Sequence, residues 1–166
     1  MDNIVLVGMP SCGKSTLGRH LAKQLGYTFI DTDDVIRDLN QCELQDIIDK
    51  DGREVFLRRE EEAVCSVNTH RHVIATGGSV VYSPVAMAHL KALGTIVYLY
   101  ISYPTLEKRI GDPRTRGLVF APGFGLKDMY DERTALYEQY ADITLCESEG
   151  DTPTESTEKL IALLHI

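Results

Sequence analysis

The feature that most constrains the fold is the stretch GMPSCGKST, which directly follows the apolar run NIVLV near the start of the chain. It satisfies the pattern G-x-x-x-x-G-K-[S/T], with Gly8, Gly13, Lys14 and Ser15 at the fixed places. β-Branched residues precede the motif and a helical pattern follows it, which is the context of a phosphate-binding loop between a strand and a helix. The alternative is a tight turn that happens to contain Gly-Lys-Ser.

In such a loop, backbone N–H groups and the positive end of the next helix hold a phosphate. Lys14 is expected to reach the β- and γ-phosphates, and the Ser15 hydroxyl to ligate Mg²⁺. Cys12 either fills the loop as a small residue or is a reactive thiol at a helix N-terminus. The residues expected around the nucleotide phosphates are Gly8, Pro10, Ser11, Cys12, Gly13, Lys14, Ser15 and Thr16.

Short strand-like runs alternate with longer helical patterns along the rest of the chain. The predicted strands are residues 3–7, 27–31, 72–76, 95–101 and 142–146, and the predicted helices are residues 14–25, 44–50, 53–69, 84–93, 104–110, 126–140 and 153–165. This alternation predicts an α/β fold with a five-stranded parallel sheet and helices on both faces, giving three layers. We expect one domain over residues 1–166, because this length is typical of a single domain.

Charge and hydropathy narrow the function classes. The chain has 17 Lys and Arg against 25 Asp and Glu, a formal charge of −8, which disfavours a nucleic-acid or anionic-membrane partner. The longest apolar runs are too short to cross a bilayer, and the start lacks the pattern of a signal peptide. The four cysteines form no CxxC pair, which indicates reduced thiols. We therefore expect a cytoplasmic protein, and nothing in the sequence demands more than a monomer.

One segment, residues 111–125, shows no periodicity. It combines glycines and prolines with Arg114 and Arg116, and it lies between two predicted helices. This composition predicts a mobile lid, and a mobile basic loop in such a fold often closes over a phosphate that is being transferred.

Ligands of a parallel sheet bind at the carboxyl ends of its strands, and the second strand ends in FIDTDDVI. Asp31 and Asp33 are two apart on a segment taken as extended, so both side chains are expected to point to one side. One would serve a metal and the other a hydroxyl group. A helix cap is the alternative role for an Asp here, and we assign that role to Thr32 or Asp34.

Two later stretches add candidate binding residues. Gly77 and Gly78 end the third strand, where a missing side chain lets a ligand approach the backbone, although a tight turn also explains them. Arg133 lies one helical turn before Tyr137, and its guanidinium suits a carboxylate or a phosphate. A single such arginine is also compatible with an ordinary solvated charge.

Together, GMPSCGKSTLGRHLAKQLG, FIDTDDVI, GREVFLRREEEAV, VIATGGSVV, IVYLYIS, RTRGLV and ERTALYEQYAD resemble the shikimate kinase family, in that order and over most of the chain. The resemblance implies the fold of the nucleoside-monophosphate-kinase group of P-loop proteins. It also implies transfer of the γ-phosphoryl group of ATP to the 3-hydroxyl of shikimate, with Mg²⁺, in aromatic amino-acid biosynthesis.

The resemblance assigns roles residue by residue. The expected catalytic residues are Lys14 on the transferring phosphate, Asp33 as general base or orienter of the attacking hydroxyl, and Arg116 as the lid arginine. Ser15 and Asp31 would organise Mg²⁺. At the adenine, Arg109 would stack on the base and Thr152-Pro153 would border it. The expected acceptor-binding residues are Asp33, Arg58, Gly77, Gly78, Ser79 and Arg133, within a helical segment of about residues 32–70.

The sequence departs from the family pattern mainly in the acceptor half. The family has Phe-Arg-x-x-Glu where this chain has Phe56-Leu57-Arg58-Arg59-Glu60, so the arginine that clamps the shikimate carboxylate is Leu57 here. Arg58 is one place on, a rotation of about 100° around the helix. Ser79 replaces the third glycine of a Gly-Gly-Gly run.

These departures leave other functions open. A paralogous kinase for another hydroxylated small acid or polyol is favoured by Leu57. A nucleotide-binding sensor without catalysis is the alternative from a different class, and the retained base and lid charge disfavour it.

Overall fold

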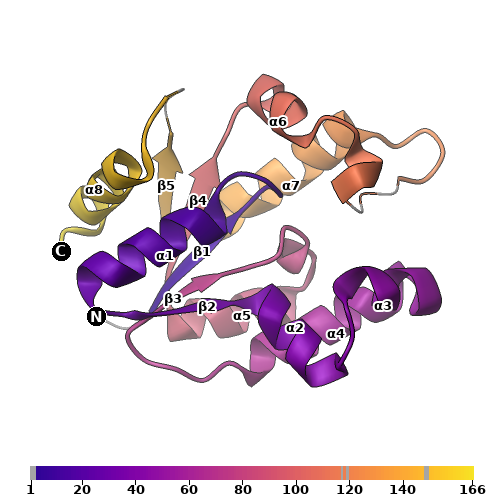
Figure 1. Cartoon of the computed structure of the whole chain (residues 1–166), viewed down its shortest axis with the longest axis horizontal. Coiled ribbons are helices and arrows are strands. Elements are labelled where there is room, and N and C mark those ends of the chain that lie inside the picture. Colours follow the sequence, from indigo (N-terminus) through magenta and orange to yellow (C-terminus); the bar gives the residue numbers. More distant parts are fainter. Residues whose placement is uncertain (1–2, 117, 119, 148–149) are drawn as a thin grey trace.

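The computed structural model describes residues 3–116, 118, 120–147 and 150–166, with Thr115 and Arg116 described by their backbone alone. Five strands alternate with helices, which confirms the predicted fold class (Figure 1). The strands are β1 (Asn3–Gly8), β2 (Thr28–Asp31), β3 (His72–Ala75), β4 (Gly94–Tyr100) and β5 (Ile143–Cys146). The helices are α1 (Lys14–Leu25), α2 (Thr32–Asn40), α3 (Leu44–Asp51), α4 (Arg53–Ser66), α5 (Pro84–Leu93), α6 (Tyr103–Ile110), α7 (Leu126–Tyr140) and α8 (Pro153–Leu164), with the 3₁₀ turns η1 (Val80–Tyr82) and η2 (Pro113–Arg116).

The strands form one parallel sheet in the order β2-β3-β1-β4-β5. The central strand β1 pairs with β3 on one side and with β4 on the other, so that Val5 lies opposite both Ile74 and Ile96. All six residues of β1 are buried. Because the strand order reverses at β1, its carboxyl end is the switch point at which such sheets bind ligands.

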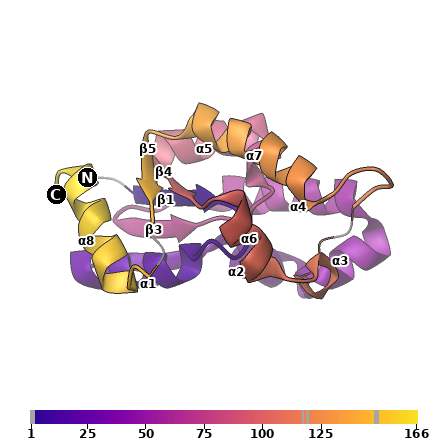
Figure 2. The same cartoon turned by 90° about the horizontal axis from the view of Figure 1, so that it is seen from above.

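Helices cover both faces of the sheet, giving the predicted three layers (Figure 2). Helices α1 and α8 lie together on one face, and α5 and α7 cover the other, with α4 packed beside α5. Most of the buried apolar side chains belong to one core between these layers. Among the described residues, no helix has the length and apolar character needed to cross a membrane.

Local sequence signals explain where several helices begin and end. Ser83 caps α5 by accepting a hydrogen bond from the N–H of Ala86, and Pro84 occupies the first helical position. Thr152 and Glu155 form a reciprocal capping box at the start of α8. Helix α1 ends at Leu25 and is capped by Gly26, whose left-handed backbone is strongly favoured by glycine.

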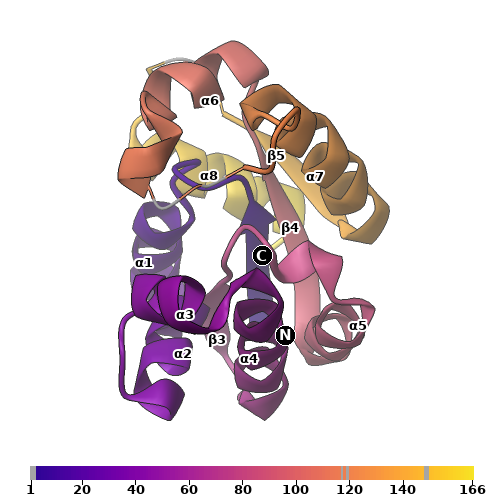
Figure 3. The ribbon, with the colours of Figure 1, turned by 90° about the vertical axis from the view of Figure 1, so that its right-hand side faces the viewer.

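Helices α2, α3 and α4 have a small core of their own, made by the buried side chains Ile36, Ile47, Phe56 and Ala63. They lie at one end of the molecule, and the C-terminus and the start of β1 lie at the other (Figure 1). Figure 3 shows the molecule from the end formed by these three helices. Residues 32–70 as an acceptor-binding segment and residues 111–125 as a lid stay predictions.

The segment after β2 differs from the sequence-based expectation in two ways. Helix α2 begins at Thr32, so Asp33 lies in the first helical turn and the premise of an extended Asp31–Asp33 segment was wrong. The assignment of the cap to Thr32 or Asp34 was also wrong, because the Asp31 side chain accepts a hydrogen bond from the N–H of Asp33. Thr32 is instead buried, and its hydroxyl accepts from the N–H of Gly77.

Candidate active site

The loop between β1 and α1 is shaped to surround an anion. Gly13 has φ +97°, a left-handed backbone that leads directly into α1 at Lys14. The Lys14 side chain is only 8% exposed, and its ammonium donates to the carbonyl oxygens of Gly8 at 2.8 Å and Met9 at 2.7 Å. The loop thus holds a cation against its own backbone, beside the N–H groups at the start of a helix.

Cys12 is fully buried inside this loop. Its sulfur accepts a hydrogen bond from the Lys14 ammonium at 3.6 Å. This position agrees with the interpretation of Cys12 as a small residue that fills the loop.

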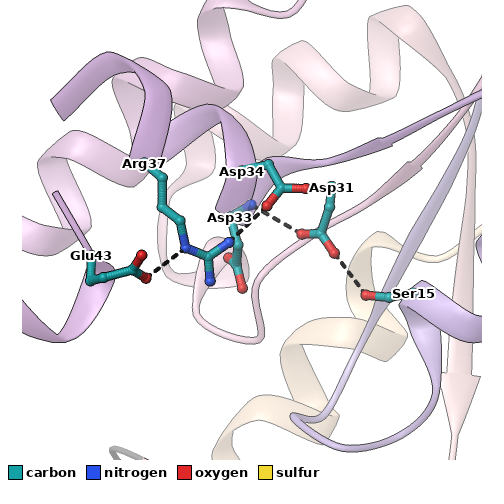
Figure 4. A network of polar contacts seen from close by, with 6 residues as sticks. All are labelled: Ser15, Asp31, Asp33, Asp34, Arg37 and Glu43. Atoms are coloured by element: carbon teal, nitrogen blue, oxygen red, sulfur yellow. Dashed lines mark hydrogen bonds and ion pairs between the residues drawn. The ribbon is translucent and has the colours of Figure 1, made fainter. Parts of the chain in front are cut away.

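Asp31 joins the loop to the end of β2 (Figure 4). Its Oδ2 accepts from the Ser15 hydroxyl at 2.7 Å, while its Oδ1 caps α2. A hydroxyl and a carboxylate oxygen suit Mg²⁺, which usually takes one or two protein oxygens and completes its shell with water and phosphate oxygens. Over the described residues no group of three or more His, Cys, Asp or Glu side chains could hold a metal ion, so such a shell would depend on phosphate and water here.

Asp33 lies beside this pair and is mostly withdrawn from water. Burial raises the pKa of its carboxyl above the ordinary value, and the neighbouring Asp31 carboxylate raises it further. Arg37 opposes the effect from the next turn, where it forms ion pairs with Asp34 and Glu43 (Figure 4). A carboxyl with a raised pKa is a stronger proton acceptor once it is ionised.

Glu60 is a site residue that the sequence reasoning missed. It is 2% exposed, its Oε2 accepts from the Ser79 hydroxyl at 2.6 Å, and burial raises its pKa to about 7. A side chain on Gly77 would clash with it, because an added Cβ would lie 2.5 Å from Oε1. The available signal was its spacing, because a residue four places after Phe56 lies on the same buried face of the helix. The Ser79 hydroxyl is therefore bound to the buried Glu60 carboxyl group.

Arg133 and Tyr137 reach the Gly-Gly turn from α7. The Tyr137 hydroxyl donates to the carbonyl oxygen of Gly78 at 2.6 Å, and a Cβ on Gly78 would lie 2.8 Å from the Arg133 guanidinium. Arg133 is 8% exposed and has no carboxylate within ion-pair distance among the described residues. A buried cation normally has an anionic partner, so a ligand anion would satisfy it.

Two cavities meet at these residues. The first, the loop cavity, has a volume of about 380 Å³ and is lined by Pro10, Ser11, Gly13, Lys14, Ser15, Thr16, Asp31, Asp33, Thr76, Gly77 and Gly78. The second, the α4 cavity, has a volume of about 250 Å³ and is lined by Pro10, Asp33, Leu44, Gln45, Ile48, Arg53, Phe56, Leu57, Glu60, Gly77, Gly78, Ser79, Tyr82, Leu118, Phe120, Phe124, Met129 and Arg133. Asp33, Pro10 and the glycine pair belong to both.

The remaining predicted residues are more dispersed. Arg109 lines a third cavity after β4, and its guanidinium donates to the Ser11 carbonyl at 3.4 Å. Pro153 is exposed at the start of α8 and is not among the described residues that line this cavity. The side chain of Arg116 lies outside the described residues. Arg58 lines a separate, smaller cavity of about 150 Å³, and the lining residues described for the α4 cavity do not include it.

Comparison with known proteins identifies the family. The shikimate kinase profile matches residues 10–165. The chain belongs to the shikimate kinase family. A shikimate kinase of Thermodesulfovibrio yellowstonii is 38% identical over 97% of this chain and 94% of its own length, and one of Thermosynechococcus vestitus is 35% identical over 98% and 89%. The solved shikimate kinase of Acinetobacter baumannii in complex with shikimate superposes with a TM-score of 0.88 at 30% identity, covering 99% of this chain and 93% of that one.

Membership confirms the class of chemistry predicted from the sequence. Kinases of this family use ATP with Mg²⁺, and this chain is an ATP-dependent kinase. The loop cavity fits that chemistry, because Lys14, Ser15 and Asp31 line it together. The roles of individual residues stay predictions.

Proposed function

We propose that the chain transfers the γ-phosphoryl group of ATP to the 3-hydroxyl of shikimate. The observation that carries the proposal is the junction of the two cavities at Asp33. A phosphate in the loop cavity and a hydroxyl in the α4 cavity would both adjoin this carboxyl. The α4 cavity also offers Arg133, a buried cation suited to the one carboxylate of shikimate.

Four residues of the loop cavity have assigned tasks. Lys14 neutralises charge on the transferring phosphoryl group. Ser15 and Asp31 would hold Mg²⁺, which when bound would neutralise charge on the phosphates. Asp33 accepts the proton of the attacking hydroxyl or orients that hydroxyl. The raised pKa of Asp33 favours this task, because proton transfer is most efficient when the base has a pKa nearer to the working pH.

The other half of the site positions the reactants. We assign Arg109 to the adenine, Arg133 to the acceptor carboxylate, and Arg116 to charge that develops during transfer. Leu118, Phe120 and Phe124 from residues 111–125 line the α4 cavity, which supports a lid that excludes water from the reaction. We also propose that the protein acts in the cytoplasm as a single-domain monomer.

A coupled ADP-release assay with Mg-ATP and a panel of acceptors tests the proposal. Shikimate, quinate, gluconate, homoserine and nucleoside monophosphates are the acceptors. We expect turnover on shikimate at a low KM. Turnover on another hydroxy acid alone would refute shikimate as the acceptor and support the paralogous kinase, the second candidate, which the apolar Leu57 in the α4 cavity favours. ATP binding without turnover on any acceptor would support the sensor.

A further inference from the structure

The α4 cavity lacks an arginine at the position where the family resemblance places one. Leu57 occupies that position, lines the cavity and packs against the small core of Ile36, Ile47, Phe56 and Ala63. Arg58 lines the separate, smaller cavity instead. The second positive charge on a bound carboxylate must therefore come from elsewhere in the chain.

Arg53 lies one helical turn before Leu57 on α4, on the same face, and it also lines the α4 cavity. The carbon of its guanidinium lies 5.4 Å from the centroid of the Tyr82 ring. The guanidinium of Arg133 lies 5.3 Å from the same centroid, and its Nε contacts the Tyr82 hydroxyl at 3.4 Å. One ring thus has two arginines, from α4 and α7, within cation–π distance, and all three residues line the α4 cavity.

The helix itself does not benefit from Arg53. As the first residue of α4 it puts a cation at the positive end of the helix dipole, which is unfavourable. Among the described residues it forms no ion pair with Asp or Glu, and neither does Arg133. Both guanidinium groups line the α4 cavity without a carboxylate partner, and a carboxylate ligand has two oxygens that can accept hydrogen bonds from them.

Tyr82 is itself fixed in place. It lies in η1 directly after the Gly77-Gly78-Ser79 turn, and its hydroxyl donates to a Glu132 carboxylate oxygen at 2.5 Å. Its ring stacks with the guanidinium groups by cation–π attraction, which orders two flexible side chains before a ligand binds.

We propose that Arg53 replaces the missing arginine of position 57, and that Arg53 and Arg133, ordered by the Tyr82 ring, grip the carboxylate of the acceptor. This inference rests on the proposed function. It makes Arg53 a specificity-determining residue that selects acceptors with a carboxylate over neutral analogues of the same shape.

The first test compares Arg53→Met with Lys50→Met. Lys50 is an exposed cation in the last turn of α3, close to the start of α4, and it is not among the described residues that line the cavities. Methionine keeps much of the aliphatic length and a good helix propensity, and both variants remove one positive charge from this end of the molecule. We expect the KM for shikimate to rise about tenfold in Arg53→Met, as expected for one charged hydrogen-bonding contact, with the KM for ATP unchanged and kcat little altered. Lys50→Met is expected to stay within twofold of the parent. An unchanged KM in Arg53→Met, or an equal rise in Lys50→Met, would overturn the inference.

The second test replaces the carboxylate instead of the arginine. The parent is expected to prefer shikimate over its carboxamide by tenfold or more in kcat/KM, and Arg53→Met is expected to lose most of that preference. If Arg53→Met lost equal factors of kcat/KM with shikimate and with the carboxamide, Arg53 would act through the fold instead of through the carboxylate. This result would overturn the inference.

A pair of variants at Tyr82 tests whether its ring orders the two arginines. Tyr82→Phe keeps the ring and is expected to retain most of the affinity for shikimate, whereas Tyr82→Leu is expected to lose it by severalfold. Equal behaviour of the two variants would refute ordering of the arginines by the ring.

Titration calorimetry of shikimate in the presence of ADP separates this inference from the proposed function. Shikimate that binds without turnover would refute the proposed function, and the variants would still decide the role of Arg53. If the parent binds no shikimate, the acceptor that it does phosphorylate decides the matter. An acceptor without a carboxylate would overturn both proposals.

Discussion

Glu60→Gln should remove a pH dependence from the stability of the protein. Burial raises the pKa of the Glu60 carboxyl to about 7 from the ordinary 4.5, and the Asp33 charge also raises it, while the Ser79 hydrogen bond and Arg133 lower it. The folded state therefore binds this proton more tightly than the unfolded chain. As pH rises from about 4.5 to about 7, the contribution of Glu60 to the free energy of unfolding falls.

The magnitude follows from the two pKa values. A pKa of about 7 against 4.5 corresponds to about 3 kcal/mol, at roughly 1.4 kcal/mol for each pKa unit. Glutamine keeps a carbonyl oxygen for the Ser79 hydroxyl and cannot ionise. Between acid and neutral pH, we therefore expect the unfolding free energy of Glu60→Gln to rise by up to about 3 kcal/mol relative to that of the parent. The exchange of the carboxyl for an amide adds a constant difference at every pH.

Urea unfolding followed by circular dichroism at pH 5, 6, 7 and 8 measures the effect. The quantity of interest is the difference in unfolding free energy between variant and parent at each pH. Glu62→Gln is the matched control, because Glu62 is an exposed glutamate on the same helix. Its difference from the parent is expected to stay flat. A flat difference for Glu60→Gln as well would show that burial does not perturb Glu60, and would refute the reasoning.

Three further predictions test other parts of the molecule. Asp33→Asn should lower kcat by about a hundredfold or more with the KM for ATP within threefold, measured by coupled ADP release; turnover within a fewfold of the parent would contradict its role as base. Leu57→Arg adds a guanidinium to the α4 cavity and should lower the KM for shikimate, and an unchanged KM would contradict the placement of α4. Gly94→Ala should destabilise the fold by more than about 2 kcal/mol in thermal unfolding, because its Cβ would lie 2.0 Å from the backbone oxygen of Asn3. Gly125→Ala, whose Cβ would have 3.7 Å to its nearest neighbour, is the control and should cost less than about 1 kcal/mol.

Local signals were sufficient for much of the fold and for the phosphate loop. The loop motif, the buried strands and the helix caps depend on residues close together in the chain, so their spacing alone predicts their structure. The confirmed strands agree with the predicted ones to within a residue or two. Lys14, Ser15 and Asp31 came together as expected, because parallel strands bring their carboxyl ends to one edge.

The start of α2 shows where local reasoning failed. Asp31, Thr32 and Asp34 are all good N-cap residues, so composition could not choose among them. The choice depends on contacts with distant residues: Ser15 donates to Asp31, and Gly77 donates to Thr32.

By itself, then, the sequence determined the class of fold, the phosphate loop and the family, since these depend on motifs that are contiguous or regularly spaced. Only the tertiary structure decided the acceptor side: that Arg53 and Arg133 share the ring of Tyr82, and that Glu60 is buried beneath Ser79. These contacts join α4, α7 and the turn after β3, which are far apart in the chain. Their distances and the loss of water around them arise when the helices pack, and no local pattern encodes either.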